Sequence, residues 1–320
     1  MNADASLISH FDALLLDLDG VIYIGPHAIG HAVSACARAR SEGLALAFVT
    51  NNASRPPAMV AEHLRELGIE ASEHDVVNAS QAAARVIADR LPPGSPVLAI
   101  GGPGVRAALI DRGFVPVDSA DPTPAAVMMG YGPDVGWKDL AEASYAVQAG
   151  ALFVATNPDT SFPTPRGMAP GNGTLVAAVV AATGCQPIVA GKPYRPLIVE
   201  SIERVGSTRP LMIGDRLDTD IEAAHNANID SLLVMTGVTS VRDILLATPQ
   251  HRPTYIAPDL RGLFMPLDQA CVANDPVPSM CAPLLTAAAA AWARADAGQD
   301  PCADVDVAAL ESLVSAGLTR

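Results

Sequence analysis

Short runs of apolar residues recur along this chain, and each is followed by a loop and a stretch with helical periodicity. The runs are almost continuously apolar, which is typical of parallel strands that helices cover on both faces. We therefore predict buried strands at 13–18, 44–49, 97–100, 126–129, 152–155, 211–213 and 231–235. The stretches between them predict helices at 32–41, 57–67, 81–89, 104–112, 137–148, 174–182, 195–205 and 220–227. This alternation predicts an α/β fold with a doubly wound, Rossmann-like parallel sheet.

The end of the chain departs from this pattern. Residues 263–320 are rich in alanine and contain two predicted helices, at 282–295 and 305–316, without a reactive group of side chains. Chain termini that are ordered are usually tied down by docking. We therefore expect a helical C-terminal tail that docks on the fold or serves oligomerisation. The length of 320 residues otherwise suits two domains.

Composition and charge narrow the class of protein. Hydrophobic residues make up 50% of the chain, which is ample for a sizeable core and excludes disorder for most of its length. The formal net charge is 20 − 34 = −14, and lysine and arginine form no cluster in the sequence. A nucleic acid would be repelled by such a chain. We therefore predict no nucleic-acid partner.

The cysteines and the apolar runs bear on the compartment. Five scattered cysteines form no Cys-x-x-Cys pair: Cys36, Cys185, Cys271, Cys281 and Cys302. This distribution argues against a disulfide framework or a zinc site and suits a reducing cytoplasm. The sequence shows no signal-peptide pattern and no run of about 18 apolar residues. We expect a cytoplasmic protein without a membrane span.

The first segment with candidate chemistry is Asp17-Leu18-Asp19-Gly20, at the end of the first predicted strand. Residues two apart in a strand point to the same side, so Asp17 and Asp19 share a face. Neighbouring carboxylates raise each other's pKa unless a cation neutralises them, and Mg²⁺ prefers carboxylates together with phosphate and water. With the metal bound, one Asp can act as nucleophile and the other can shuttle a proton. Taken alone, a turn with two solvated acids accounts for the pair equally well.

Two further segments follow apolar runs. Thr50-Asn51-Asn52 offers a hydroxyl and backbone N–H groups that can bind an anion, although a turn of the kind that Asn favours accounts for the run equally well. Lys192 is one of only two lysines, beside eighteen arginines. Because Gly191 precedes it and Pro193 follows it, we predict a fixed turn that holds its ammonium near a nucleophile and a phosphate, rather than a mobile surface lysine.

The fourth segment contains two more carboxylates. The strand at 211–213 leads to Asp215, and a short loop brings Asp220 to the start of the next helix. A carboxylate at a helix N-terminus is favourable by itself, so capping suffices to account for Asp220. Capping does not account for Asp215, since a third strand-end carboxylate is costly without a cation. Ligands bind at the carboxyl ends of strands in open α/β sheets, and all four segments are predicted to lie there.

In this order, the four segments resemble the motifs of the haloacid dehalogenase superfamily of phosphatases, over about residues 10–262. The resemblance is closest to the subfamily with a large cap between the second and third motifs, which includes nitrophenylphosphatases, phosphoglycolate phosphatases, pyridoxal phosphatases and bacterial glycerol-phosphate phosphatases. Three runs are similar to that subfamily in particular: Thr50-Asn51-Asn52-Ala53-Ser54-Arg55, Ala155-Thr156-Asn157-Pro158-Asp159 and Pro170-Gly171-Asn172-Gly173-Thr174.

The resemblance implies a domain organisation and a cap loop. It implies a first core part at 1–81, an inserted α/β cap domain at 82–188, a second core part at 189–262 and the Ala-rich extension at 263–320. A loop of the cap, around 157–167, would project into the cleft and select the substrate. Asn157, Asp159 and Arg166 are its candidate contacts, although a solvated loop accounts for Asp159 and Arg166 equally well.

The resemblance also implies a role for each matching residue. Asp17 would attack phosphorus and become an aspartyl phosphate, while Asp19 would act as acid and base. Thr50, the Asn51 amide and Lys192 would hold the phosphoryl group. Mg²⁺, which Mn²⁺ or Co²⁺ could replace, would bind Asp17, the backbone carbonyl of Asp19 and Asp215, with Asp220 supporting the metal shell.

The expected substrate is a small phosphate ester. The arginine-rich composition and the tailed, cap-containing form resemble actinobacterial members of the family that hydrolyse glycerol 3-phosphate, so we expect that substrate. Phosphoglycolate or a sugar phosphate is the alternative. A phospho-acceptor signalling domain also uses a strand-end Asp, a Thr and a Lys, but it lacks a proton shuttle such as Asp19, and the long insertion would block a partner kinase. Whether the chain forms a homo-oligomer stays open.

Overall fold

The computed structural model describes residues 6–164, 166–266, 282–303 and 305–318. Contacts divide the chain into two compact units. The first consists of the chain up to Phe48, Arg65–Glu70 and the chain from Ile202 onward, and the second of Val49–Leu64 and Ala71–Ser201. Within the described residues, none of the helices combines the length and the hydrophobicity that crossing a membrane requires.

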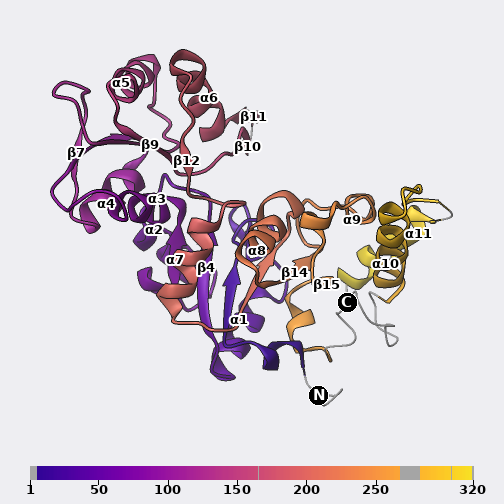
Figure 1. The fold of residues 1–320 in the computed structure, drawn as a ribbon. Coiled ribbons are helices and arrows are strands. Elements are labelled where there is room, and N and C mark those ends of the chain that lie inside the picture. The colour runs from indigo at the N-terminus through magenta and orange to yellow at the C-terminus, as the bar shows by residue number, and fades with distance from the viewer. Residues whose placement is uncertain (1–5, 165, 267–281, 304, 319–320) are drawn as a thin grey trace. The chain divides into compact units, whose positions relative to one another are not determined.

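A six-stranded sheet contains the first strand of the chain (Figure 1). Its order is β15-β14-β13-β1-β4-β5, and Figure 1 labels its strands β4, β14 and β15. β1 pairs in parallel with both β13 and β4, and β14 pairs in parallel with β13 and β15. The bounds are β1 Ala13–Leu16, β4 Ala45–Thr50, β5 Val76–Asn78, β13 Pro210–Gly214, β14 Asp230–Val234 and β15 Tyr255–Ala257.

β1 is the point at which the sheet reverses its winding. The chain proceeds from β1 to β4 and β5 on one side, and later from β13 to β14 and β15 on the other. All four residues of β1 are buried, as expected of a strand covered on both faces. In such sheets, ligands bind outside the carboxyl ends of the strands at the switch point. The prediction of a doubly wound sheet is therefore confirmed.

Helices follow the strands of this sheet along the chain, and a side-chain cap begins one of them. Asn78 accepts from the backbone N–H of Gln81, and the Gln81 side chain accepts from the backbone N–H of Asn78, both at 3.0 Å. This capping box starts the helix at Ala79, two residues before the predicted start. The bounds are α1 Ala32–Ser41, α2 Pro57–Glu66, α3 Ala79–Ala88, α7 Arg195–Val205, α8 Glu222–Ala227 and α9 Val241–Leu245.

The second unit has a parallel sheet of its own. Its order is β12-β9-β8-β6-β7. Figure 1 shows α5 and α6 on one face of this sheet and α3 and α4 on the other. The bounds are β6 Pro96–Ile100, α4 Pro103–Asp111, β7 Val115–Val117, β8 Ala126–Met129, α5 Trp137–Gln148, β9 Leu152–Ala155, α6 Asn172–Thr183 and β12 Ile188–Val189.

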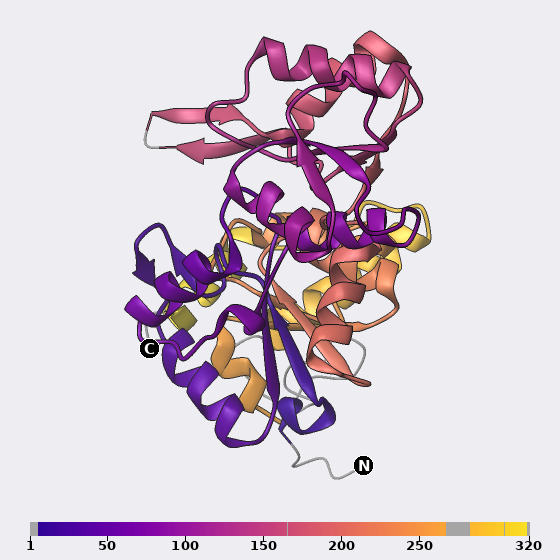
Figure 2. The ribbon, with the colours of Figure 1, turned by 90° about the vertical axis from the view of Figure 1, so that its left-hand side faces the viewer.

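Two hairpins supplement the sheets. β2 (Tyr23–Ile24) and β3 (His27–Ala28) follow the first strand, and β10 (Ser161–Thr164) pairs antiparallel with β11 (Gly167–Pro170). The second hairpin extends away from the helices of its unit, as its magenta-pink arrows show in Figure 2. Part of the loop predicted at 157–167 is therefore a strand of this hairpin.

The C-terminal helices belong to the first unit. α10 (Ala282–Asp296) and α11 (Val307–Leu318) lie beside α9 in Figure 1. Side chains of both helices join one hydrophobic cluster with residues of α9 and of β14. The predicted helical tail is thus confirmed over the residues described, while the prediction for 267–281 lies outside them.

The structure also qualifies the predicted boundaries. All seven predicted strands are present within two residues of their predicted ends, and the unpredicted strands of the two large sheets, β5, β7, β12 and β15, have only two or three residues each. The proposed cap range, 82–188, contains most of the second sheet, whereas the second compact unit also takes in Val49–Leu64 and the chain to Ser201. The domain boundaries therefore stay a proposal.

Asp12 fixes the start of β1 against the turn that precedes β13. Its carboxylate accepts hydrogen bonds from the Ser207 hydroxyl, from the hydroxyl and N–H of Thr208 at 2.8 and 3.0 Å, and from the Arg209 N–H at 3.0 Å. Burial works against the charge, but these hydrogen bonds hold the pKa of Asp12 well below its ordinary value of 3.8. The bonds need the ionised carboxylate.

We predict that Asp12→Asn lowers the free energy of unfolding at pH 7 by roughly 1 kcal/mol, the scale of a few partly exposed hydrogen bonds. A depressed folded-state pKa contributes stability above the unfolded value, 3.8, and loses it as the pH falls toward the folded value. The difference between wild type and variant should therefore be constant above about pH 5 and shrink below about pH 4. Urea unfolding from pH 7 to pH 3 measures it, and a difference independent of pH would contradict this role.

Candidate active site

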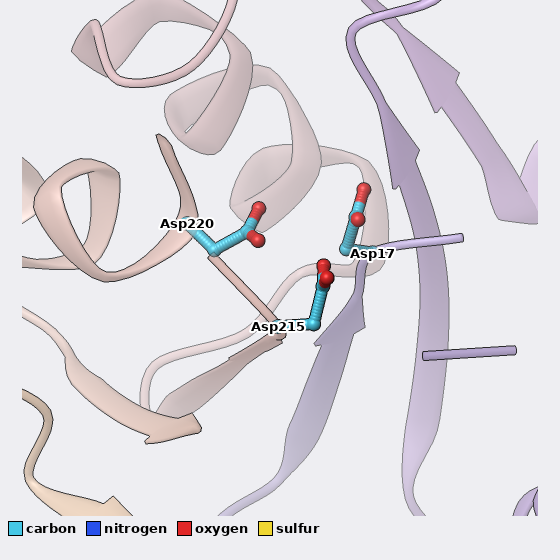
Figure 3. A group of neighbouring side chains, drawn as sticks. All are labelled: Asp17, Asp215 and Asp220. Atoms are coloured by element: carbon cyan, nitrogen blue, oxygen red, sulfur yellow. The ribbon is translucent and has the colours of Figure 1, made fainter. Parts of the chain in front are cut away.

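Three carboxylates of the first unit lie together at the carboxyl edge of its sheet. Asp17 follows β1, Asp215 follows β13, and Asp220 lies in the π-helical turn η3 (Leu217–Ile221). One ligand oxygen from each lies within 4.8 Å of the others. Figure 3 shows the three carboxyl groups gathered between the ends of the two strands and the turn. The sheet brings Asp17 and Asp215 together because β1 and β13 are parallel neighbours.

The group is nearly closed to solvent. The exposed fractions are 9% for Asp17, 2% for Asp215 and 0% for Asp220. Buried carboxylates at this separation repel one another unless a cation compensates them. Oxygens on opposite sides of a Mg²⁺ ion are about 4 Å apart, so a group within 4.8 Å can close around such an ion. A donor set of carboxylate oxygens alone fits a hard divalent cation.

Backbone groups orient two of these carboxylates. The Val238 N–H donates to Asp215 Oδ2 at 2.9 Å, and the Arg216 N–H donates to Asp220 Oδ2 at 3.1 Å. Asp220 therefore caps its turn and also belongs to the acidic group. The Arg216 guanidinium binds Asp218 at 2.8 and 3.0 Å and lowers the pKa of that carboxyl, which keeps this neighbouring charge paired.

Asp19 lies differently from Asp17. Its side chain is exposed, and its backbone bridges to Tyr23 at the base of the β2–β3 hairpin. Gly20 follows with φ +82°, a conformation that glycine adopts without strain and that turns the chain into this hairpin. The side chain of Asp19 is not in the three-carboxylate group, so only its backbone carbonyl remains as a predicted metal ligand.

In the second unit, Thr50 ends β4. Its side chain is 4% exposed, and its oxygen accepts from the Asn52 N–H at 3.1 Å. Because a hydroxyl that accepts can still donate its own proton, Thr50 has a donor to offer an anion. The Asn52 side chain accepts from the N–H of Ser54 at 3.0 Å, which closes the turn after the strand.

The carboxamide of Asn51 pairs with the main chain of Lys192. Its Oδ1 accepts from the Lys192 N–H at 2.8 Å, and its Nδ2 donates to the Lys192 carbonyl at 3.0 Å. Lys192 itself is 2% exposed, and its ammonium donates to the Val49 carbonyl at 3.4 Å. At Gly191, a Cβ atom would lie 2.7 Å from Asn51 Oδ1, so this approach requires glycine. Two hydrogen bonds thus fix the backbone that carries the ammonium.

The three predicted substrate contacts, Asn157, Asp159 and Arg166, differ from one another in burial and in hydrogen bonding. Asn157 is 4% exposed, and its amide donates to the Asn51 carbonyl at 2.8 Å while its oxygen accepts from the Asp159 N–H at 3.2 Å. The Asp159 carboxylate accepts from Asn51 Nδ2 at 3.3 and 3.4 Å. Arg166 is exposed at the turn of the β10–β11 hairpin. These bonds give Asn157 a scaffolding role, and contact of the three residues with substrate stays a prediction.

Several residues of these sites were not predicted. Val238 and Thr239 bind Asp215 through a backbone N–H and a hydroxyl, and neither has a distinctive motif. Asn172 is 1% exposed and donates to the carbonyls of Asn157 at 2.8 Å and Met129 at 3.3 Å. The run Pro170-Gly171-Asn172-Gly173-Thr174, similar to the subfamily, was the signal in the sequence that pointed toward Asn172.

Comparisons with known proteins agree with this arrangement. Residues 14–115 match the family of haloacid dehalogenase-like hydrolases, and residues 189–263 match a family described as HAD-hydrolase-like. The chain is 46% identical over 271 residues to the D-glycerol 3-phosphate phosphatase of Mycobacterium tuberculosis, covering 85% of this chain and 76% of that protein. It is 34% identical over 264 residues to the acid sugar phosphatase of Staphylococcus aureus, covering 82% of this chain and 100% of that protein.

A solved structure is similar along most of its length. The glycerol phosphate phosphatase of Mycobacterium tuberculosis, crystallised in complex with magnesium, superposes with a TM-score of 0.85 at 41% sequence identity, covering 90% of this chain and 92% of that chain. Identity at this level over most of both chains exceeds what a shared fold alone produces. The chain belongs to the haloacid dehalogenase-like hydrolases.

Proposed function

We propose that this protein is a Mg²⁺-dependent phosphomonoesterase in which Asp17 is the nucleophile. The observation that carries the proposal is the buried group of Asp17, Asp215 and Asp220 at the switch point of the sheet. Bound there, Mg²⁺ supplies positive charge that neutralises the carboxylates and the phosphate. The related phosphatase crystallised with magnesium supports this choice of metal.

The chemistry follows from the carboxylates on either side of Leu18. Asp17 attacks phosphorus, the bond between phosphorus and the ester oxygen breaks, and Asp19 gives its proton to the departing alkoxide. In the second half, water attacks the phosphoryl group on Asp17 while Asp19 takes a proton from that water. Inorganic phosphate leaves, and both carboxyl groups return to their starting states. The exposed position of Asp19 suits a group that must exchange protons with the leaving group and with water.

Thr50, the Asn51 N–H and Lys192 are the proposed phosphate-binding groups. Charge spreads over the phosphoryl oxygens during transfer, and fixed donors directed at them provide most of the catalysis. The hydroxyl proton of Thr50 and the buried ammonium of Lys192 have the required chemistry. Because the Asn51 carboxamide is engaged by Lys192 and Asp159, only its backbone N–H serves the phosphate.

The proposed substrate is glycerol 3-phosphate. The relative that is 46% identical carries that activity in its name, and supports this choice over a larger ester. Phosphoglycolate or a sugar phosphate is the alternative, since another relative is named an acid sugar phosphatase. Selection would fall to the proposed cap at 82–188, through Asp159 and Arg166. A phospho-acceptor role is not favoured, because the named relatives are phosphatases. The cytoplasmic location stays a prediction, and whether the chain forms a homo-oligomer stays open.

The first test is a panel of phosphate esters assayed with Mg²⁺ for wild type and Asp17→Asn. We expect the highest kcat/KM on glycerol 3-phosphate. In Asp17→Asn, we expect kcat/KM to fall by at least about 10³-fold, because the neutral carboxamide cannot replace the carboxylate as nucleophile. Asp12→Asn, at the other end of the same strand, is the matched control and should retain activity. Turnover by Asp17→Asn would refute the assignment of Asp17 as nucleophile. A wild type that forms a stable phosphoenzyme without turnover would favour the phospho-acceptor class.

A second test concerns the pair of Asn51 and Lys192. We expect Lys192→Met to lower kcat by about 10²-fold or more, and Asn51→Ala, which keeps the backbone N–H, by about tenfold, because the ammonium loses its fixed position. If Asn51 acts through Lys192, the double variant should be no slower than Lys192→Met alone.

The control for this cycle is Asn78→Ala, which removes another buried amide of the same unit. The fold-losses in kcat of Asn78→Ala and Lys192→Met should multiply in the double variant. The reason is that the side chain of Asn78 forms its hydrogen bonds with Arg55 and Gln81 rather than with the turn that carries the lysine. If the fold-losses in kcat of Asn51→Ala and Lys192→Met multiply in their double variant as well, Asn51 works independently of the lysine.

A further inference from the structure

The loop after β14 wraps around the carboxylate of Asp215. We call residues 236–239 the strap. Val238 N–H donates to Asp215 Oδ2 at 2.9 Å, and the Thr239 hydroxyl donates to the Asp215 carbonyl at 2.5 Å. A Cβ atom on Gly237 would overlap the Asp215 carboxylate, so the strap touches it directly. The position of this carboxylate therefore depends on the position of the strap.

The strap continues into α9, a helix of five residues. The Ser240 side chain caps it by accepting from the Asp243 N–H at 3.2 Å, and Asp243 accepts in return from the Ser240 N–H at 2.9 Å. A helix this short is not stable by itself in water, because few hydrogen bonds offset the cost of its nucleation. Its stability, and the anchorage of the strap, must come from packing.

The C-terminal helices provide that packing. Val241, Ile244 and Leu245 of α9 are 2%, 0% and 0% exposed. They lie in one hydrophobic cluster with buried side chains of α10 and α11, which are Leu284, Leu285, Ala288, Ala291, Trp292, Leu310 and Val314. The apolar face of α9 is thus covered by residues far from it in sequence but beside it in the fold (Figure 1).

Trp292 fixes the register of this contact. Its indole N–H donates to the Ile244 carbonyl at 2.7 Å, at the end of α9, where the same carbonyl also accepts from the Ala247 N–H at 3.1 Å. Arg252 lies over the indole ring at 5.5 Å and binds Asp296 through two hydrogen bonds of 2.7 and 2.8 Å. A directional hydrogen bond and an ion pair thus add to the apolar contact between α9 and α10. Apolar contact alone would permit the two helices to slide along each other.

The same cluster reaches the turn that carries Asp220. Leu217 and Ile221, at the two ends of η3, are 9% and 1% exposed and belong to it. Asp220 lies between them in sequence and is fully buried. The loops that hold two of the three clustered carboxylates therefore rest on one apolar cluster, and α10 and α11 provide much of it.

We propose that the C-terminal helix pair is a positioning element for the cation site, with Trp292 as its central residue. It holds α9 and η3 in place, and through them the carboxylates of Asp215 and Asp220. The inference rests on the proposed function only for the identity of the cation. In this proposal, α10 and α11 not only stabilise the fold by docking on it but also position metal ligands of their own chain.

The test is calorimetric titration of Mg²⁺ into the full-length protein after chelation, comparing wild type with Trp292→Ala. Outer groups that orient metal ligands typically change affinity by about 10–100-fold, and Trp292 acts one step further away, so we expect a rise in Kd of about three- to tenfold. The Mg²⁺-dependent increase in Tm should shrink in parallel. Both measurements are independent of turnover.

The matched control is Leu263→Ala, which opens a cavity in the first unit at a residue outside this cluster. It should lower Tm and leave the Mg²⁺ affinity unchanged. Equal affinities for wild type and Trp292→Ala, or equal weakening in both variants, would overturn the proposal. If Trp292→Ala does not fold, the smaller truncation Val314→Ala decides between the same outcomes. A wild type that binds no Mg²⁺ would instead overturn the proposed function, and this inference with it.

Discussion

The mutual repulsion of three buried carboxylates is the constraint on which this structure depends. Asp17, Asp215 and Asp220 are at most 9% exposed, and their ligand oxygens lie within 4.8 Å of one another. Such a group is costly unless a cation is bound. The surrounding backbone must therefore hold the carboxylates in place at an energetic cost. The parallel pairing of β1 with β13 and the N–H groups of Arg216 and Val238 provide that support.

The topology explains why residues far apart in sequence share one site. Since β1 and β13 are parallel neighbours, the residues that follow these two strands emerge at one edge of the sheet. A chain that winds outward in both directions from β1 leaves that edge uncovered by its own crossover connections. Charged and polar side chains can be placed there without disturbing the four buried residues of β1. The strand itself thus contributes to the core, while the proposed chemistry falls to the residue that follows it.

Residues whose side chains are proposed to carry the chemistry were predictable from the sequence. Asp17, Lys192 and Asp215 each follow an apolar run, and a charge at the end of a buried strand is costly unless it binds a ligand or an opposite charge. A residue that orients a carboxylate through its backbone alone, such as Val238, was not predictable. The Val238 N–H could be replaced by that of almost any residue, so its contact with Asp215 leaves no trace in residue type. Short strands such as β12, with two residues, likewise carry too little periodicity to be recognised.

Asn51 shows how the structure refines a role that the sequence could only suggest. A carboxamide has one acceptor oxygen and two N–H donors. The oxygen accepts from the Lys192 N–H, while Nδ2 donates to the Lys192 carbonyl and faces the carboxylate of Asp159. Its donors and acceptor are therefore used within the protein, and no side-chain hydrogen bond remains for a phosphate. A residue type that suggested ligand binding instead joins the proposed phosphate-binding lysine to the loop proposed to select the substrate, so a change at Asp159 would reach Lys192 through a single side chain.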